Sequence, residues 1–295
     1  MEEPPGVVDL IVETALGVEV SDWTRPRNGR SAKTYIIEIE GESDPLICKI
    51  GGPSVFTDAV IEPLVVEFVA ERTTLPVPAV IARGHLTGVS HPWDRWALYE
   101  YIQGMTPASL ISLDSPSKKQ LLHGVGSILG ELHTRCTFDR LGGLDREDGC
   151  LMIRPCDGLN FPMLERRIRT TFNKSDGESA VLGHGDLFPG NLMIDDHGRI
   201  TGVFDWANGH VTDPGYDLAV AELRFIDWFN LPPEASRQAL LEGYRQHRSV
   251  PDTFTRLHRR YKLLWLLQNG EQAIRQLTTP HGRRQLRKML PAGHS

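Results

Sequence analysis

Apolar and polar residues follow two different periods along the first third of the chain. Residues 32–40 and 46–50 are short, apolar-rich runs separated by turn-forming residues, which predicts two paired strands. Residues 62–72 carry apolar side chains at helical spacing and stop before a Leu-Pro-Val-Pro segment, which predicts a helix. A further helix is expected near 7–16 and a buried strand near 96–102.

From about residue 107 onward the periodicity is mainly helical. Helices are predicted over 115–133, from 213 onward, over 233–247 and over 253–276. The exception is a second hairpin, in which apolar residues 192–194 and 200–204 flank the turn-forming tetrad Asp-Asp-His-Gly.

Three polar residues surround this second hairpin. Asp186 lies in the loop before it, and Asn191 and Asp205 stand at its two open ends, so the three side chains can converge on one small volume. Phosphoryl transfer needs such a set, because one carboxylate must orient the acceptor hydroxyl and take its proton. An amide oxygen and a second carboxylate then suit magnesium. We predict Asp186 for the first role and Asn191 and Asp205 for the second; the alternative is that all three cap turns.

At these residues the chain resembles the aminoglycoside phosphotransferase and choline kinase family, a branch of the protein-kinase-like fold. The shared pattern is His184-Gly185-Asp186, then Asn191, then Asp205 ahead of Asp217-Leu218-Ala219. A typical protein kinase carries arginine at the position of Gly185 and follows its metal-binding aspartate with Phe-Gly rather than Trp206-Ala207. The resemblance therefore points to kinases of small molecules.

The resemblance implies an α+β, protein-kinase-like fold of two lobes. A small N-terminal lobe with an antiparallel sheet, residues 1–102, would hold the nucleotide. A larger, mainly helical C-terminal lobe, residues 103–295, would carry catalysis and acceptor binding. ATP and Mg²⁺ are the implied cofactors, and the implied partner is a small molecule with a hydroxyl group. A protein partner is unknown.

In such a lobe a lysine on the second strand of the hairpin reaches the α- and β-phosphates and is held by a glutamate from the next helix. Lys49 is that lysine by position. Glu62, at the start of the predicted helix, is its expected partner, and Glu67 is the second choice. The competing interpretation is an ordinary surface pair.

Two further segments are expected to contact the nucleotide. The loop before the first hairpin is not a Gly-x-Gly-x-x-Gly loop, but Gly29 and Ser31 suit a turn that covers phosphates. The strand ending near residue 102 resembles the hinge between lobes, where backbone groups of Glu100 and Ile102 are expected to bind adenine.

Composition fits a soluble enzyme. The 295 residues are 40% hydrophobic, and no run approaches the roughly 20 apolar residues of a membrane helix, so we expect a cytoplasmic protein without membrane contact. The formal charge of −6 argues against nucleic acid as a partner. The four cysteines show no metal-type spacing.

The acceptor is the least determined part of the prediction. A helical insertion over about 154–178 mixes carboxylates with basic residues, and the basic C-terminal stretch 283–288 suits a neutral or anionic acceptor at least as well as a polycationic antibiotic. The alternatives are a metabolite kinase for homoserine, choline or a sugar, a non-catalytic ATP sensor, and a protein kinase.

His133 is expected to be a core histidine, and Asp213 and Asp217 are expected to brace the catalytic loop rather than bind metal.

Overall fold

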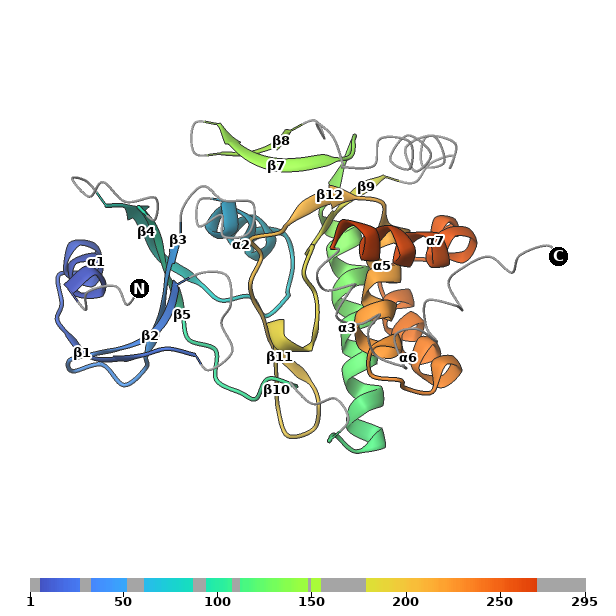
Figure 1. Cartoon of the computed structure of the whole chain (residues 1–295), viewed down its shortest axis with the longest axis horizontal. Helices are drawn as coiled ribbons and strands as arrows, with labels where there is room; N and C mark the ends of the chain where they lie inside the picture. Colours follow the sequence, from blue (N-terminus) through green and yellow to red (C-terminus); the bar gives the residue numbers. More distant parts are fainter. Residues whose placement is uncertain are drawn as a thin grey trace.

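The computed structural model describes residues 6–26, 33–51, 61–86, 94–107, 112–147, 150–154 and 179–269. Its N-terminal part is a five-stranded antiparallel sheet in the order β1-β2-β3-β5-β4, preceded by helix α1 (Figure 1). These elements are α1 (Gly6–Leu16), β1 (Val20–Thr24), β2 (Lys33–Ile39), β3 (Leu46–Gly51), β4 (Val80–His85) and β5 (Arg95–Glu100). The predicted helix and hairpin are confirmed.

The two faces of this sheet serve different parts of the molecule. Successive side chains of a strand point to opposite faces. On β3, Cys48 and Ile50 therefore join the apolar cluster that α1 covers. Lys49 lies between them in sequence and points to the other face, toward helix α2 (Ile61–Arg72), whose Glu62 it contacts.

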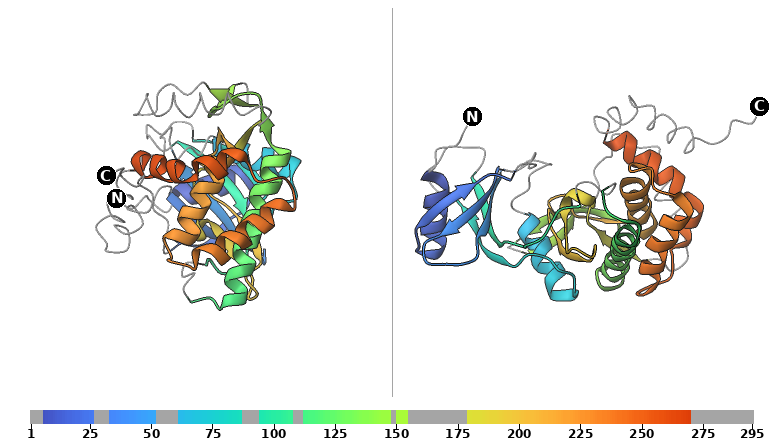
Figure 2. Two further views of the ribbon diagram at one scale, coloured as in Figure 1. Left: turned by 90° about the vertical axis from the view of Figure 1, so that its right-hand side faces the viewer. Right: turned by 90° about the horizontal axis from the view of Figure 1, so that it is seen from below.

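Helix α2 links the sheet to the rest of the protein. Its residues Ile61, Val65 and Val69 recur at helical spacing and belong to the large core cluster that extends into the C-terminal helices. Figures 1 and 2 show α2 between the N-terminal sheet on one side and the helical part on the other. The expected division of the chain after residue 102 remains a prediction.

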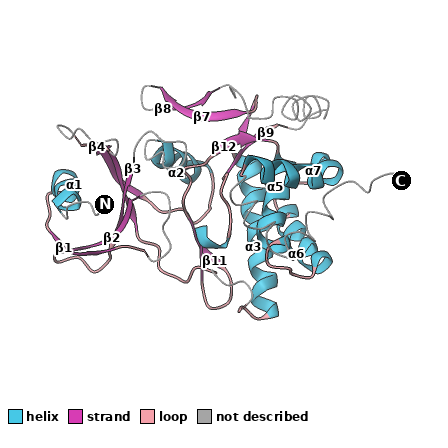
Figure 3. Ribbon diagram, viewed as in Figure 1, coloured by secondary structure: helices cyan, strands magenta, loops and turns pink. Residues whose placement is uncertain are grey.

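The C-terminal part gathers α3 (Ser115–Arg135), α5 (Pro214–Glu222), α6 (Pro233–Arg245) and α7 (Asp252–Gln268) on one side of the molecule (Figure 3). Helices α3 and α6 cross closely because glycines stand at the crossing. A Cβ on Gly126 would come within 1.8 Å of the Leu240 carbonyl oxygen, and one on Gly243 within 1.9 Å of the His123 carbonyl oxygen. The end of the predicted helix 253–276 beyond residue 269 lies outside the described residues.

The second predicted hairpin is also confirmed. Strands β10 (Leu192–Ile194) and β11 (Ile200–Val203) pair antiparallel after a short 3-10 turn, η1 (Pro189–Asn191). Asp195 closes the turn by accepting hydrogen bonds from the backbone amides of His197 and Arg199, both at 2.9 Å. The chain between the two parts runs alongside, since Met105 forms a bridge with Ile194.

The structure corrects the expectation that residues after about 107 are helical apart from this hairpin. A five-stranded sheet in the order β6-β9-β12-β7-β8 is present as well. Its strands are β6 (Thr137–Phe138), β7 (Gly142–Glu147), β8 (Cys150–Arg154), β9 (Ala180–Gly183) and β12 (His210–Thr212). They are two to six residues long, and β7 has the sequence Gly-Gly-Leu-Asp-Arg-Glu, which has little β propensity.

In the part of the chain that the structure describes, no helix combines the length and apolar character needed to span a bilayer. The acceptor insertion expected over about 154–178 lies almost wholly outside the described residues, as do Gly29 and Ser31. Of that range only Arg154 is described, and it ends β8 rather than starting a helix.

Candidate active site

The open end of the β10–β11 hairpin brings the predicted trio together. The amide nitrogen of Asn191 donates to the backbone oxygen of Asp186 at 2.9 Å and to its carboxylate at 3.1 Å. Phe204, which directly precedes Asp205, donates its backbone N–H to the Asn191 carbonyl at 3.2 Å. Because Nδ2 of Asn191 faces two oxygens, its amide oxygen is the atom left for a ligand.

His184 joins the two halves of this site. Its Nε2 donates to the carbonyl oxygen of Phe204 at 3.1 Å, so Nδ1 is the acceptor for the backbone N–H of Asp186 at 3.3 Å. His184 is 1% exposed, and its ring centroid lies 4.3 Å from that of Trp206. Burial lowers the pKa of His184 and so favours the neutral ring. These two hydrogen bonds require a neutral ring with its proton on Nε2.

Lys49 ties the N-terminal sheet to the hairpin. Its Nζ lies 2.7 Å from Glu62 and 3.1 Å from Asp205. Glu62 also accepts the backbone N–H of Trp206 at 3.2 Å, so it holds both the lysine and the chain next to Asp205. Glu67 does not take part, because its carboxylate pairs with Arg83 at 3.2 Å. Glu62 is therefore the partner of Lys49, and the second choice is wrong.

One ammonium group thus serves two carboxylates. Burial alone would lower the pKa of Lys49, but Glu62 and Asp205 outweigh burial and raise that pKa above its ordinary value. Lys49 holds the pKa of Asp205 below its usual range. Burial has the opposite effect on Glu62 and raises the pKa of that carboxyl. These shifts favour a charged Lys49–Asp205 pair, whereas burial destabilises the negative charge on Glu62.

Two residues of the site, Gly185 and Asp205, have an uncommon backbone conformation. Gly185 has a φ of 78°, and a Cβ there would stand 1.9 Å from the Asn208 carbonyl oxygen. The arginine that protein kinases carry at this position would not fit beside Asn208. Asp205 also has a positive φ, 67°, an uncommon conformation for a residue other than glycine and one that is found at functional sites.

The expected hinge residues lie between the sheet and the hairpin. The backbone N–H of Glu100 donates to the Ala79 carbonyl at 3.0 Å, so its carbonyl oxygen is the group that adenine contact would use. Ile102 packs close to the hairpin, because a Cβ on Gly202 would lie 2.8 Å from its Cγ2. Their contacts with a nucleotide remain a prediction.

Asp213 and Asp217 both have partners on neighbouring helices, and their expected bracing of the loop around Asp186 stays a prediction. Asp213 caps α5 by accepting the Gly215 N–H at 2.7 Å, and it also accepts the hydroxyl of Thr253 from α7 at 2.8 Å. Asp217 lies 3.3 Å from Nε2 of His133, a fully buried core histidine as predicted. Burial would raise the pKa of Asp217, but the hydrogen bond to His133 overrides it and lowers that pKa.

Arg224 is the site residue that the sequence did not reveal. It lies in a π-helical turn, η2 (Leu223–Asp227), and its Nη1 contacts the Asp186 carboxylate. The signal that would have found it is a set of charged residues inside the otherwise apolar run 218–229. Charges in such a run are buried and therefore paired.

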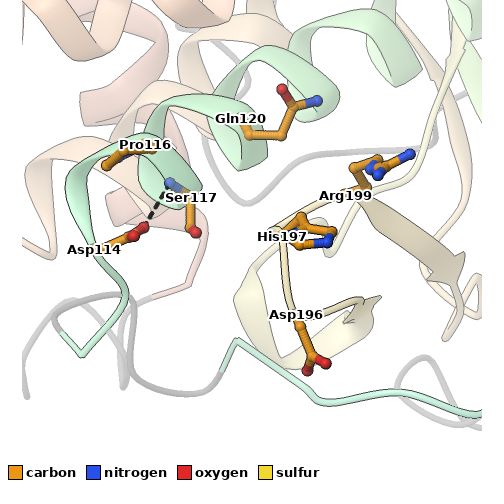
Figure 4. Close-up of a pocket in the computed structure, with 7 residues that line it drawn as sticks. All are labelled: Asp114, Pro116, Ser117, Gln120, Asp196, His197 and Arg199. Carbon is orange, nitrogen blue, oxygen red and sulfur yellow. Dashed lines mark hydrogen bonds between the residues drawn. The ribbon is translucent and has the colours of Figure 1, made fainter.

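A depression lined by Asp114, Ser117, Asp196 and Arg199 lies at the opposite, turn end of the hairpin (Figure 4). Its position away from Asp186 and the absence of any buried unpaired group among these side chains separate it from the site. Among the described residues there is no cluster of three or more His, Cys, Asp or Glu side chains able to hold a metal without further ligands. A metal here would need the Asn191 oxygen, water or phosphate as well.

Comparison with known proteins agrees with this geometry. A family model described as "Phosphotransferase enzyme family" matches residues 22–258. The chain belongs to this phosphotransferase enzyme family. The match covers the Lys49 hairpin, α2, the β10–β11 hairpin and the C-terminal sheet, so the prediction of the family from sequence is confirmed.

Among curated proteins, the phosphotransferase chain is 38% identical over 180 residues to the uncharacterized protein YcbJ of Bacillus subtilis (strain 168), which covers 50% of this chain and 53% of that protein. The chain thus spans about half the length of the curated relative it matches.

Several solved structures share the fold, including two phosphotransferases. A thermostable mutant of aminoglycoside phosphotransferase APH(4)-Ia, in a ternary complex with ADP and hygromycin B, has a TM-score of 0.64 at 16% identity, over 98% of this chain and 99% of that one. Macrolide 2'-phosphotransferase MphH from Brachybacterium faecium has a TM-score of 0.55 at 16% identity, over 99% and 100% of the two chains. At these identities the likeness is one of fold, and it confirms the α+β, protein-kinase-like architecture.

Proposed function

We propose that this phosphotransferase moves the γ-phosphate of ATP to a hydroxyl group of a small molecule. The observation that carries the proposal is the double contact of Lys49 with Glu62 and Asp205, at 2.7 and 3.1 Å, beside the Asn191–Asp186 pair. It joins the sheet lobe to the hairpin in the arrangement that phosphoryl transfer uses. The ADP complex of the similarly folded APH(4)-Ia enzyme supports nucleotide use.

Each residue has a proposed role. Lys49, oriented by Glu62, would bind the α- and β-phosphates, and Asp186 would orient the acceptor hydroxyl and take its proton. The amide oxygen of Asn191 and the carboxylate of Asp205 would hold Mg²⁺, since oxygen donors of these types suit it. Magnesium bound there would neutralise charge on the phosphates. Backbone groups of Glu100 and Ile102, and Gly29 and Ser31, would complete the nucleotide site.

Two observations support the proposal against the alternatives of an ATP sensor and a protein kinase. The intact set of Lys49, Asp186, Asn191 and Asp205 is more than a non-catalytic ATP sensor requires. The close approach of Asn208 to Gly185 leaves no room for the arginine of a protein kinase. An antibiotic kinase and a metabolite kinase use the same chemistry, and the fold alone does not choose between them.

The test is ADP release from Mg-ATP by the purified protein with a panel of aminoglycosides, macrolides, amino alcohols and sugars. Asp186→Asn is expected to keep ATP affinity and lose acceptor-stimulated turnover. Asp205→Asn is expected to lose magnesium-dependent ATP affinity. Asp196→Asn, an exposed change on the turn of the same hairpin, is the matched control and is expected to behave as wild type.

Three results would contradict the proposal. Retained turnover in Asp186→Asn would refute the role of Asp186 as the base. Unchanged ATP affinity in Asp205→Asn would refute the role of Asp205 in magnesium binding. If wild-type protein binds no ATP in the presence of magnesium, the activity itself is excluded. ATP binding without turnover on any acceptor would instead favour the sensor.

A further inference from the structure

The carboxylate proposed as the base is already occupied on both sides. One Asp186 oxygen, Oδ1, accepts from Nη1 of Arg224, and the other, Oδ2, accepts from Nδ2 of Asn191 at 3.1 Å. The Asp186 side chain is 25% exposed, whereas the Arg224 side chain is only 3% exposed. An acceptor hydroxyl that reaches Asp186 from solvent must therefore share or replace one of these two bonds.

Asp186 is the carboxylate that pairs with Arg224, and the other contacts of the guanidinium are with aromatic rings. Its guanidinium carbon lies 4.5 Å from the ring centroid of Phe188, 5.4 Å from that of Trp228 and 5.2 Å from that of Trp265. Aromatic faces attract a cation but leave its charge in place. The Nε of Arg224 is buried and has no hydrogen-bond partner in the described part of the chain. The Arg224 guanidinium thus has a donor that its bond to Asp186 does not use.

The turn that carries Arg224 is itself fixed. Lys262 of α7 binds Glu222 just before η2 and Asp227 at its end, the latter at 2.6 Å. Arg237 of α6 binds the same Glu222. Single π-helical turns are rare and are frequent at functional sites. Because both ends of the turn are clamped, little side-chain and backbone freedom remains to be lost when Arg224 binds a ligand.

We propose that Arg224 determines acceptor specificity by binding an anionic oxygen group, a carboxylate or a phosphate, of the hydroxyl compound that is phosphorylated. The new bond would replace the one to Asp186 and leave Oδ1 for the acceptor hydroxyl. This inference rests on the proposed function, because it assigns the acceptor of that same site.

Charge decides which acceptor can make this exchange. An anion matches the planar fork of donors on arginine and can compete with the Asp186 carboxylate for it. An ammonium group cannot replace Asp186 as a partner and is repelled by the fixed guanidinium. Repulsion of a like charge contributes to specificity alongside the attractive contact with the preferred ligand.

A charge-matched series of acceptors tests the inference. Glucose, gluconate, glucose 6-phosphate and glucosamine share most of their hydroxyl groups and differ in charge, and glycerol, glycerate and glycerol 3-phosphate repeat the contrast; hygromycin B adds a polycation. ADP release from Mg-ATP is measured for wild type, Arg224→Gln and Arg224→Lys. Arg259→Gln, which removes an exposed arginine of α7, is the control.

Turnover is expected to be concentrated in the anionic acceptors, and the carboxylates and phosphates will show which group is preferred. Arg224→Gln should lower kcat/KM for these acceptors on the order of 10- to 100-fold, mainly through KM, because a charge-assisted bond is lost. Arg224→Lys should fall between, since it keeps the charge and loses the fork, and it replaces Arg224→Gln as the test if the latter does not fold. The KM for ATP should not change.

Two results would overturn the role of Arg224. One is a neutral or cationic compound as the best acceptor. The other is an equal loss of turnover for all charge classes in Arg224→Gln, which would make Arg224 a positioning residue only. If no compound is turned over, titration of gluconate and of inorganic phosphate into the MgADP complex decides: binding lost in Arg224→Gln supports the role, and no binding overturns it. Failure of wild type to bind ATP would instead reject the proposed function.

Discussion

Replacing Lys49 should destabilise the fold, because Lys49 is the cation that pairs with both Glu62 and Asp205. In Lys49→Met the carboxylates of Glu62 and Asp205 lose their shared cation. The Glu62 side chain is 5% exposed, and leaving a buried charge unpaired costs about 3–5 kcal/mol. Asp205 is 36% exposed, so its share is smaller because solvent screens it. At about 2 °C per kcal/mol for a chain of this size, the melting temperature should fall by roughly 6–10 °C.

The loss should depend on pH in a defined direction. Burial already raises the pKa of Glu62 above its unfolded value, and without Lys49 it should rise further. A folded-state pKa above the unfolded one means that the folded state binds the extra proton, so stability is lost as pH rises through the folded pKa. The deficit of Lys49→Met relative to wild type should therefore be larger at pH 8 than at pH 5.

A double-mutant cycle followed by urea and thermal unfolding makes the test decisive. Adding Glu62→Gln to Lys49→Met removes the unpaired charge of Glu62, so the double variant should regain part of the lost stability, with a coupling energy of roughly 1–3 kcal/mol. Lys119→Met, at an exposed position on α3, is the control. The reasoning fails if the two losses simply add, or if the pH profile of Lys49→Met runs parallel to that of wild type.

Two further perturbations test buried contacts in and near the candidate site. Gly185→Ala should cost several kcal/mol of unfolding free energy, because its Cβ would stand 1.9 Å from the Asn208 carbonyl oxygen. Gly41→Ala, with a similar φ of 84° but open space around it, is the control and should cost only about 1 kcal/mol. Equal losses in urea unfolding would reject the steric argument. His133→Phe leaves Asp217 buried without its hydrogen-bond partner and should cost roughly 3 kcal/mol at pH 7. His133 lowers the pKa of Asp217 against the effect of burial, so the stability it provides is present above the unfolded pKa and is lost as pH falls. The deficit of His133→Phe should accordingly shrink toward pH 4, and a loss independent of pH would contradict the pairing.

The elements that the sequence revealed are those with local signals. Helix α3 begins where Asp114 caps it and Pro116 occupies its first turn, and α5 begins at the cap Asp213 followed by proline. The β10–β11 hairpin follows from a turn tetrad between two apolar runs, with Gly198 at a φ of 77°. The trio of Asp186, Asn191 and Asp205 was predictable because the hairpin alone brings it together.

What the sequence did not reveal depends on contacts between distant segments. The strands β6, β9 and β12 are two to four residues long and pair with one another across the C-terminal part, so their stability comes from pairing and burial rather than from propensity. The partner of Lys49 was ambiguous for the same reason. Glu62 and Glu67 lie on one helix, and only the position of α2 against the sheet directs Glu62 toward Lys49 and Glu67 toward Arg83.

Arg224 shows why such distant contacts matter for function. Its charge reaches Asp186 because α5 continues into a π-helical turn, and that turn is clamped by Lys262 from another helix. In a regular α-helix each residue adds 100° of rotation, so an inserted π turn redirects every side chain that follows. The apolar run 218–229 indicates a buried helix, yet it gives no sign of the altered turn. The residue proposed to choose the acceptor is therefore placed by packing among α5, α6 and α7, while the residues proposed to perform the transfer are placed by one local hairpin.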